Sequence, residues 1–229
     1  MKFIILAAGK GTRLGMPHPK TLTKLETGET ILQRQISFLS EYVDKKNIII
    51  VVGYKKELIM NNFPDCTFIY NSNYDTTNTA KSLLCALKEN LDSDVIWING
   101  DVVFDKKALK SILNSKKSCM LVNTESVSEE EVKYNLKSDG SIKQVSKEIN
   151  DGIGEAVGIN KVISADIKKL KNKLEECKEN DYFEYAIELL INDNIKFYPI
   201  DITENFCFEI DTREDLNCVN NYLKKYESN

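Results

Sequence analysis

The chain alternates between short apolar runs and segments in which apolar residues recur at helical spacing. Buried strands are predicted at four places in the first hundred residues: 2–8, 47–53, 66–71 and 94–100. Helices are predicted between them, at 30–43, 55–63 and 78–91. Fully apolar strands that alternate with helices predict a mostly parallel sheet with helices on both faces, and therefore an α/β fold.

The second half of the chain has a less regular pattern. Further strands are predicted at 116–124, 156–163, 195–201 and 205–211, and helices at 165–179, 182–192 and 212–226. Thr212 is the expected N-cap of the last helix. Residues 133–145 predict a β-hairpin with Asp139-Gly140 at its turn. We expect one α/β domain over residues 1–229, whose smaller mixed region covers the site.

Composition limits the partners of the protein. The 229 residues carry a net charge of −4, whereas nucleic-acid and membrane surfaces demand a basic excess. No apolar run approaches the roughly 20 residues that span a bilayer. The apolar run near the N-terminus is too short for a signal peptide. We expect a cytoplasmic protein without membrane insertion or nucleic-acid binding, and the formation of a homodimer is left open.

The cysteines and the histidine argue against several kinds of site. Six scattered cysteines without a C-x-x-C pair predict reduced, buried thiols rather than a disulfide framework or a zinc site. His18 is the only histidine, so a metal site with several histidines is impossible.

Ligands of a parallel sheet bind at the carboxyl ends of its strands. In this chain we expect four loops at that edge: the loop 8–20, the loop after Val52, the loop 71–78 and the loop after Asn99. The first of these loops combines glycines with the cations Arg13 and Lys20. The glycines allow a close backbone approach, and the cations favour an anionic ligand. The spacing fits neither G-x-G-x-x-G nor the Walker A pattern.

The segment "LAAGKGTRL", followed by "PK" at residues 19–20, resembles the signature of nucleotidyltransferases that make nucleoside-diphosphate sugars and related activated headgroups. The resemblance implies a Rossmann-like fold, with a nucleotide-binding part near residues 1–115 and an acceptor-binding part near 116–229. It implies that the following residues bind a nucleoside triphosphate: Leu6, Ala7, Ala8, Gly9 and Gly11. It also makes Arg13 and Lys20 catalytic, because they would neutralise a triphosphate of about four negative charges.

Two aspartates follow apolar strands, Asp101 in "WINGDVVF" and Asp211 in "FEIDT". Each alone could be a turn or helix-start residue. The resembled family holds a divalent cation between aspartates at two matching positions. The resemblance therefore implies Mg²⁺ on Asp101 and Asp211, since Mg²⁺ prefers hard oxygen ligands.

The segment "NSNYDTTNTAKSLLCAL" resembles the subgroup that cytidylylates phosphocholine and related small headgroups. This resemblance implies that Asn71, Asn78 and Ser82 contact the nucleotide and that Tyr74 contacts the acceptor. Asn78 could instead simply cap the helix that follows it.

Two further segments are candidates for the acceptor side. In "GEAVGINKV", Glu155 could bind an ammonium group and Lys161 a phosphate, although Lys161 could equally be a strand-face lysine. Val157 stands where the resembled sugar enzymes carry Asn or Thr. In "NDYFEYAIELL", Tyr182 and Glu184 suit a cationic headgroup through cation–π contact and charge pairing. Their apolar neighbours at helical spacing belong to the core.

The expected function is a CTP-dependent cytidylyltransferase with Mg²⁺ as cofactor. Its acceptor would be a small phosphorylated or phosphonylated headgroup that carries an amine, such as phosphocholine, 2-aminoethylphosphonate or phosphoglutamine. The product would be a CDP- or CMP-linked headgroup that is used to decorate a surface polysaccharide or lipid. A sugar-1-phosphate nucleotidyltransferase using UTP or dTTP is the alternative within enzymes, and Val157 counts against it. A non-catalytic nucleotide-binding regulator is the alternative outside enzymes.

Overall fold

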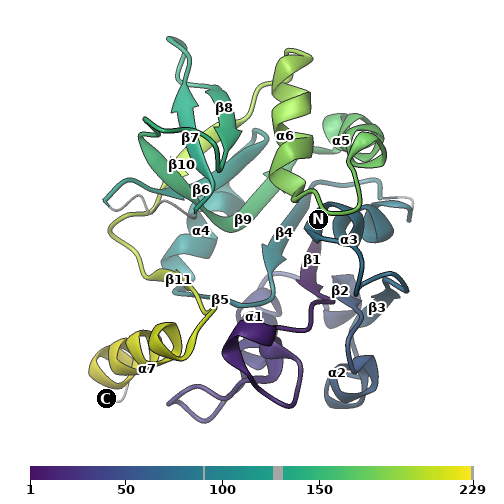
Figure 1. Ribbon diagram of the computed structural model, residues 1–229, viewed down its shortest axis with the longest axis vertical. Coiled ribbons are helices and arrows are strands. Elements are labelled where there is room, and N and C mark those ends of the chain that lie inside the picture. Colours follow the sequence, from purple (N-terminus) through teal and green to yellow (C-terminus); the bar gives the residue numbers. More distant parts are fainter. Residues whose placement is uncertain (90, 126–130, 228–229) are drawn as a thin grey trace.

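The computed structural model describes residues 1–89, 91–125 and 131–227. Its main sheet has the order β10-β6-β9-β4-β1-β2-β3, and β7 and β8 extend it beside β9 (Figure 1). In sequence order, the first four strands of this sheet are β1 (Lys2–Ala7), β2 (Ile48–Val52), β3 (Thr67–Tyr70) and β4 (Val95–Asn99). They pair in parallel, which confirms the predicted α/β class.

The rest of the main sheet comes from the second half of the chain. Its strands are β6 (Cys119–Asn123), β7 (Lys133–Leu136), β8 (Ile142–Ser146), β9 (Gly154–Val162) and β10 (Tyr198–Asp201). Strand β9 runs antiparallel to both β4 and β6, so the sheet is mixed in this region. The sheet crosses the expected boundary near residue 115, and the division into a nucleotide part and an acceptor part remains a prediction.

Helices cover both faces of the sheet because buried side chains alternate along each strand. In β1, Ile4 packs toward α3 (Thr79–Leu87), α5 (Ser164–Glu176) and α6 (Phe183–Asn192). Its neighbours Phe3 and Ile5 pack toward α1 (Ile31–Leu39), α2 (Lys56–Asn62) and α4 (Lys106–Asn114) on the other face. The two helix layers therefore leave the carboxyl ends of the central strands accessible.

The predicted hairpin is present as β7 and β8, with Gly140 at φ 77° in its turn. Two elements were not predicted: β5 (Val102–Phe104) and α4. The sequence after "NGD" read as a turn, but Val102–Phe104 pairs antiparallel with β11 (Cys207–Glu209) to form a separate small sheet. Asp105 then caps α4, since its carboxylate accepts from the backbone N–H of Ala108 at 2.9 Å.

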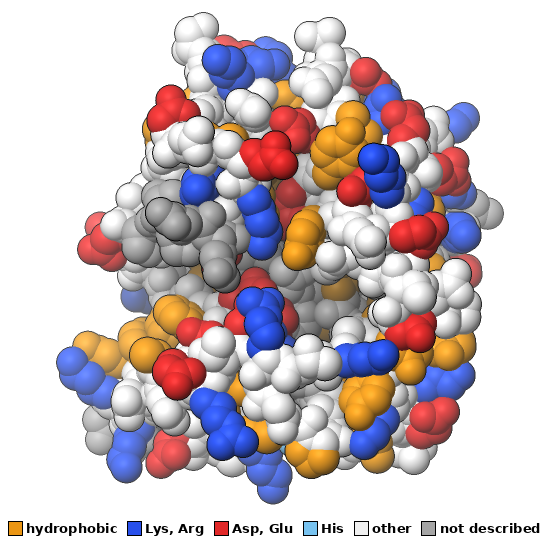
Figure 2. Space-filling view, viewed as in Figure 1, with side chains coloured by type: hydrophobic (Ala, Val, Ile, Leu, Met, Phe, Trp, Pro, Cys, Tyr) orange, Lys and Arg blue, Asp and Glu red, His pale blue; other side chains and the backbone are white. Residues whose placement is uncertain are grey.

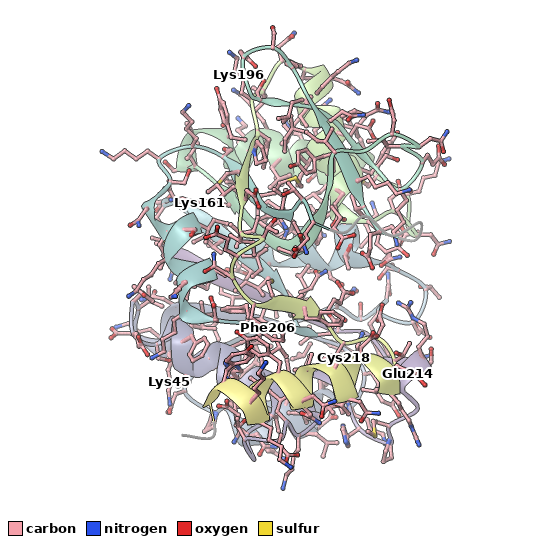
Figure 3. All side chains as sticks on the ribbon, turned by 90° about the vertical axis from the view of Figure 1, so that its left-hand side faces the viewer. Lys45, Lys161, Lys196, Phe206, Glu214 and Cys218 are labelled. Atoms are coloured by element: carbon pink, nitrogen blue, oxygen red, sulfur yellow. The ribbon has the colours of Figure 1, made fainter. Side chains whose placement is uncertain are left out.

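The C-terminal helix α7 (Arg213–Glu227) packs beside this small sheet (Figure 3). Phe206 stacks on Tyr222 with ring centroids 3.7 Å apart. Cys218 lies on α7 and is exposed, so the expectation of buried thiols is wrong for this residue; all six cysteines are free. Among the described residues, no helix is both long enough and apolar enough to cross a membrane.

Candidate active site

A cavity of about 330 Å³, here called the main cavity, opens at the carboxyl ends of β1 and β4. Figure 2 shows a hollow near the middle of this face with acidic and basic side chains around it. The expected edge of the sheet thus holds the site. Its lining comes from the glycine loop, from the start of α3, from α6 and from the acidic residues: Leu6, Ala7, Gly9, Gly11, Thr12, Arg13, Lys20, Thr21, Asn78, Thr79, Asn99, Asp101, Tyr182, Glu184, Glu209 and Asp211.

The glycine loop is shaped around Lys20. Gly11 has a left-handed backbone at φ 61°, and a Cβ added to it would lie 2.6 Å from the Cβ of Lys20. Gly15 is also left-handed, at φ 69°, but a Cβ there would meet nothing within 4 Å. Gly11 is therefore required both by its conformation and by the close approach of Lys20.

Three carboxylates face the cavity: Asp101 follows β4, Glu209 ends β11, and Asp211 lies two positions further on. One oxygen each from Asp101, Glu209 and Asp211 lies within 4.8 Å of the others. The charge of Asp101, followed by burial and the charge of Asp211, raises the pKa of Glu209 well above its usual range. Such crowding of negative charge favours a bound cation.

Two cations lie against these carboxylates. The Nζ of Lys20 donates to Asp101 at 2.7 Å and also to Asp211. Arg13 pairs with the other oxygen of Asp211 at 2.7 Å, while its own side chain is 65% exposed. Burial alone would lower the pKa of Lys20, but the charges and hydrogen bonds of Asp101 and Asp211 outweigh burial and raise it. Lys20 is therefore a buried ammonium that its two carboxylate partners keep charged at neutral pH.

The acidic cluster fits the expected divalent cation. The Oδ1 of Asp101 is buried and has no hydrogen-bond partner among the described residues. Three carboxylates in reach of one point supply the hard oxygen ligands that Mg²⁺ prefers. Glu209 was not predicted, although Glu209 and Asp211 stand two positions apart and so share one face of an extended segment.

A capping interaction at the start of α7 fixes Asp211. Thr212 Oγ1 accepts from the backbone N–H of Asp215 at 3.2 Å, which gives Thr212 the expected N-cap role. The Asp215 carboxylate accepts in return from the backbone N–H groups of Asp211 and Thr212, at 3.0 and 2.7 Å. Asp215 thus positions a candidate metal ligand without contacting the metal site itself.

The residues expected to bind the nucleotide divide into two groups. Leu6, Ala7, Gly9 and Gly11 line the main cavity. Ala8 lies beside them, but its carbonyl accepts from the backbone N–H of Tyr54. Asn78 also lines the cavity, and its side chain caps α3 by accepting from the backbone N–H of Thr79 at 2.8 Å. A role of Asn78 as helix cap is therefore compatible with a contact to the nucleotide.

Asn71, Ser82 and Tyr74 are placed differently from the expectation. The Asn71 amide donates to Ser82 at 3.1 Å and to Thr77 at 3.0 Å, and both Asn71 and Ser82 are buried. They organise the loop before α3 rather than line the main cavity. Tyr74 covers Gly53, where an added Cβ would lie 2.5 Å from it. None of these three described residues lines the cavity, so we do not carry them into the proposed site.

Tyr182 and Glu184 form the wall opposite the glycine loop. They line the main cavity and a side cavity of about 90 Å³ that continues from it past Arg13 and Lys147. Glu184 is 7% exposed, and its Oε2 has no hydrogen-bond partner among the described residues. Burial raises the pKa of Glu184 to about 7. The Nζ of Lys147, which was not predicted, lies 4.8 Å from the centre of the Tyr182 ring.

The two expected acceptor residues on β9 lie elsewhere. Ala156 and Gly158 line the side cavity, and Glu155 alternates with them along the strand, so it belongs to the other face. Lys161 lies at the far end of β9 and is buried. Its Nζ donates to the carbonyl of Ser115 at 2.5 Å and pairs with Asp94 at 3.5 Å. These contacts favour the strand-face interpretation of Lys161, and neither Glu155 nor Lys161 lines the described cavities.

A glycine loop and a cluster of carboxylates thus line one cavity, and the two cations of the loop pair directly with the carboxylates. Residues 3–160 match the model of the MobA-like NTP transferase domain, and the chain belongs to this family. Membership confirms the predicted class, a nucleotidyltransferase.

Two curated relatives illustrate the range of the family. Over 189 residues, the chain is 32% identical to the bifunctional protein GlmU of Methanococcus maripaludis, a match that covers 79% of this chain and 42% of that protein. Over 121 residues, it is 32% identical to the CMP-5'-(3-aminopropyl)phosphonate synthase of Streptomyces rubellomurinus, covering 49% of this chain and 19% of that protein. The chain thus spans less than half the length of these relatives.

Two solved structures share the fold over nearly the whole chain. The inositol-1-phosphate CTP transferase from T. maritima gives a TM-score of 0.78 at 19% identity, covering 98% of this chain and 96% of that one. The CTP:phosphocholine cytidylyltransferase from Streptococcus pneumoniae gives a TM-score of 0.76 at 22% identity, covering 97% and 99%. At these identities the likeness concerns the fold alone.

Proposed function

We propose that the protein transfers CMP from CTP to a small phosphorylated or phosphonylated acceptor that carries an amine, with release of pyrophosphate. The observation that carries the proposal is Glu184, a buried carboxylate without a hydrogen-bond partner for Oε2, beside the Tyr182 ring. An acid and an aromatic ring together suit an ammonium group. A sugar offers hydroxyl groups without a positive charge, so it would gain hydrogen bonds from Glu184 but no charge pairing.

The names of the relatives support a cytidine nucleotide and a nitrogen-bearing acceptor. One solved structure is a CTP:phosphocholine enzyme, and one relative makes a CMP-aminopropylphosphonate. Val157, which replaces the Asn or Thr of the resembled sugar enzymes, is partly buried against the core and offers no polar group.

In the proposed reaction, an acceptor oxygen attacks the α-phosphorus of CTP. The new P–O bond forms as the bond to the β-phosphate bridging oxygen breaks, and pyrophosphate leaves with the electron pair. No general base is needed, because the attacking oxygen is ionised at neutral pH. Lys20 and Arg13 stabilise the charge that builds on the phosphates. Both now pair with the carboxylates, so substrate binding exchanges these partners for phosphate oxygens.

Asp101, Glu209 and Asp211 would hold Mg²⁺. When bound, the ion would supply positive charge to the phosphate oxygens. Asp215 and Thr212 keep Asp211 directed into the cavity, through backbone hydrogen bonds of 3.0 Å or less from Asp211 and Thr212 to the Asp215 carboxylate.

A sugar-1-phosphate nucleotidyltransferase is a second candidate, because the longer of the two curated matches quoted above is to a GlmU protein and not to the CMP-phosphonate synthase. A non-catalytic nucleotide-binding regulator is a third, but the retained cations and carboxylates count against it. A cytoplasmic location, a homodimer and a role in surface polysaccharide or lipid decoration remain predictions.

The test is pyrophosphate release with Mg²⁺, crossing CTP, UTP, dTTP and ATP with a panel of acceptors. The panel contains phosphocholine, phosphoethanolamine, 2-aminoethylphosphonate, phosphoglutamine and several sugar-1-phosphates. Release with CTP and an amine-bearing acceptor supports the proposal. Release with sugar phosphates alone moves the protein to the second candidate, and CTP binding without release under any pairing supports the regulator.

A further inference from the structure

A larger cavity adjoins the acceptor side of the site. This outer cavity, of about 490 Å³, lies between α6 and the segment Gln144–Glu148 at the end of β8. Tyr182 and Glu184 line it as well as the main and side cavities. The three cavities therefore adjoin one another at these two residues.

Residues from one face of α6 and from the turn before it line this cavity. Asp181, Glu184, Tyr185 and Glu188 all line it, at spacings of three, one and three residues. Such positions share one face of a helix. The opposite face carries Phe183, Ala186, Ile187 and Leu190, which belong to the core. The core explains the second set, and the first set is the polar face that α6 turns toward the outer cavity.

The outer cavity is negatively charged. Asp181, Glu184, Glu188 and Glu148 line it against a single cation, Lys147, among the described lining residues. Lys147 lies over the Tyr182 ring at the inner end. Burial, followed by the charge of Glu148, raises the pKa of Glu188. The negative charges of Glu188 and Glu148 therefore lie close together at the outer end of the cavity. Tyr185, which is 45% exposed, lines the same cavity.

An independent observation points to a ligand. Glu184 is more than nine-tenths buried, yet its Oε2 has no hydrogen-bond partner among the described residues while the side chain lines all three cavities. A buried oxygen without a partner is costly unless something occupies the space beside it. Glu184 thus marks the region where the side and outer cavities adjoin as a place for a ligand.

Building on the proposed function, we propose that the outer cavity is a second cation subsite, formed by Glu188, Glu148 and Tyr185. The natural acceptor would then be an elongated molecule, whose phosphate or phosphonate is joined through a chain to a distal ammonium group. Its inner part passes Tyr182 and Glu184. A short amine such as 2-aminoethylphosphonate stops at Glu184 and leaves the outer subsite unused.

The test compares phosphonates of increasing length by calorimetry, in the presence of α,β-methylene-CTP. The probes are 2-aminoethyl-, 3-aminopropyl- and 6-aminohexylphosphonate, each paired with the alkylphosphonate of the same length that lacks the amine. The gain in affinity from the amine should persist or grow at the longest probe. Glu188→Gln should reduce that gain roughly three- to tenfold for 6-aminohexylphosphonate and leave 2-aminoethylphosphonate within about twofold.

Glu175→Gln is the matched control, because it makes the same charge change at an exposed residue of α5. Glu148→Gln should act in the same direction as Glu188→Gln and covers the case in which the first variant folds poorly. An amine gain that vanishes with length, or equal effects of Glu188→Gln and Glu175→Gln, overturns the subsite. If the subsite fails but CMP is transferred to 2-aminoethylphosphonate, the proposed function still holds. If the long amine binds through Glu188 but no acceptor receives CMP, the proposed function fails instead.

Discussion

The two walls of the main cavity are built in different ways. The nucleotide wall is one continuous loop, in which Gly11 and Lys20 come from the same stretch of sequence and touch each other. The acceptor wall is formed by Tyr182 and Glu184 of the α6 region, and Lys147, which follows β8, lies over the Tyr182 ring from the side cavity. The first wall is specified by backbone conformation, and the second by side chains that only the tertiary fold brings together.

This difference implies different tolerance to change. A loop whose backbone must approach a triphosphate has few alternatives, because both φ and space are fixed. A side-chain wall keeps its shape when one polar group is exchanged for another, so it can vary with the acceptor. Substitutions in the nucleotide wall should therefore reduce turnover with every acceptor, whereas substitutions in the acceptor wall should change the preference among acceptors.

The largest effect is expected from the nucleotide wall. Lys20→Ala removes the buried ammonium that reaches both Asp101 and Asp211. Turnover should fall by about 10²–10³-fold, because transition-state charge loses a preorganised partner, while CTP affinity changes by less than about tenfold. Single-turnover pyrophosphate release and CTP titration measure the two quantities. Lys24→Ala, an exposed lysine of the same segment, is the control. Unchanged turnover in Lys20→Ala would show that the loop does not have the role that the resemblance implies.

The same difference explains what the sequence could predict. The parallel sheet, the helices of both layers other than α4, the hairpin and the ligand-binding edge follow from periodicity and turn chemistry, which are local. Asp101 and Asp211 end strands, so their place at the edge was predictable. Glu209 was not recognised because its partner Asp101 lies more than a hundred positions earlier and the small sheet of β5 and β11 was not predicted.

The different placement of the expected acceptor residues has a related cause. Lys161 and Glu155 stand in a strand whose direction and register decide which residues reach the cavity, and β9 proved to be antiparallel to its neighbours. A one-residue difference in register exchanges the two faces of a strand. Lys147 carried no signal of its own, since an exposed lysine after a strand is commonplace.

The acceptor wall should respond to pH through Glu184. Burial raises the pKa of Glu184 from 4.5 to about 7 in the folded protein. The folded state thus holds this proton more tightly, and its stabilising effect is complete below pH 4.5 and is lost as the pH rises through about 7. Glu184→Gln should therefore be the more stable protein at about pH 8, by roughly 2–3 kcal/mol, with little difference at about pH 4.5.

Urea denaturation of both proteins across this pH range checks the expectation. The same variant should raise KM for amine-bearing acceptors and leave the CTP affinity within about twofold, since the lost charge belongs to the acceptor wall. Glu175→Gln should show neither effect. A stability difference between Glu184→Gln and the wild type that stays constant with pH would mean that Glu184 titrates normally.

A smaller effect is expected from two glycine substitutions in the nucleotide wall, which distinguish the cost of backbone conformation from the cost of a steric contact. Gly11→Ala and Gly15→Ala both place an alanine in left-handed backbone, which costs about 1–2 kcal/mol. Only at Gly11 does the added Cβ also meet Lys20, at 2.6 Å. We expect Gly11→Ala to lose about 1–2 kcal/mol more than Gly15→Ala and to reduce turnover, because Lys20 is displaced. Denaturation and pyrophosphate release measure both variants, and equal turnover in the two would contradict the contact.

The smallest effect concerns how Asp211 is held. Thr212→Ala removes the N-cap of α7, and Thr30→Ala removes the N-cap of α1, where Thr30 accepts from the backbone N–H of Gln33 at 3.1 Å. Each change should cost about 1 kcal/mol of stability. Thr212 also holds Asp215, whose carboxylate accepts from the backbone N–H of Asp211. Turnover should therefore fall severalfold in Thr212→Ala alone, and the magnesium concentration for half-maximal activity should rise. Equal turnover and magnesium dependence in the two variants would mean that Asp211 keeps its position without the cap, so that the strand before it is sufficient to direct the carboxylate.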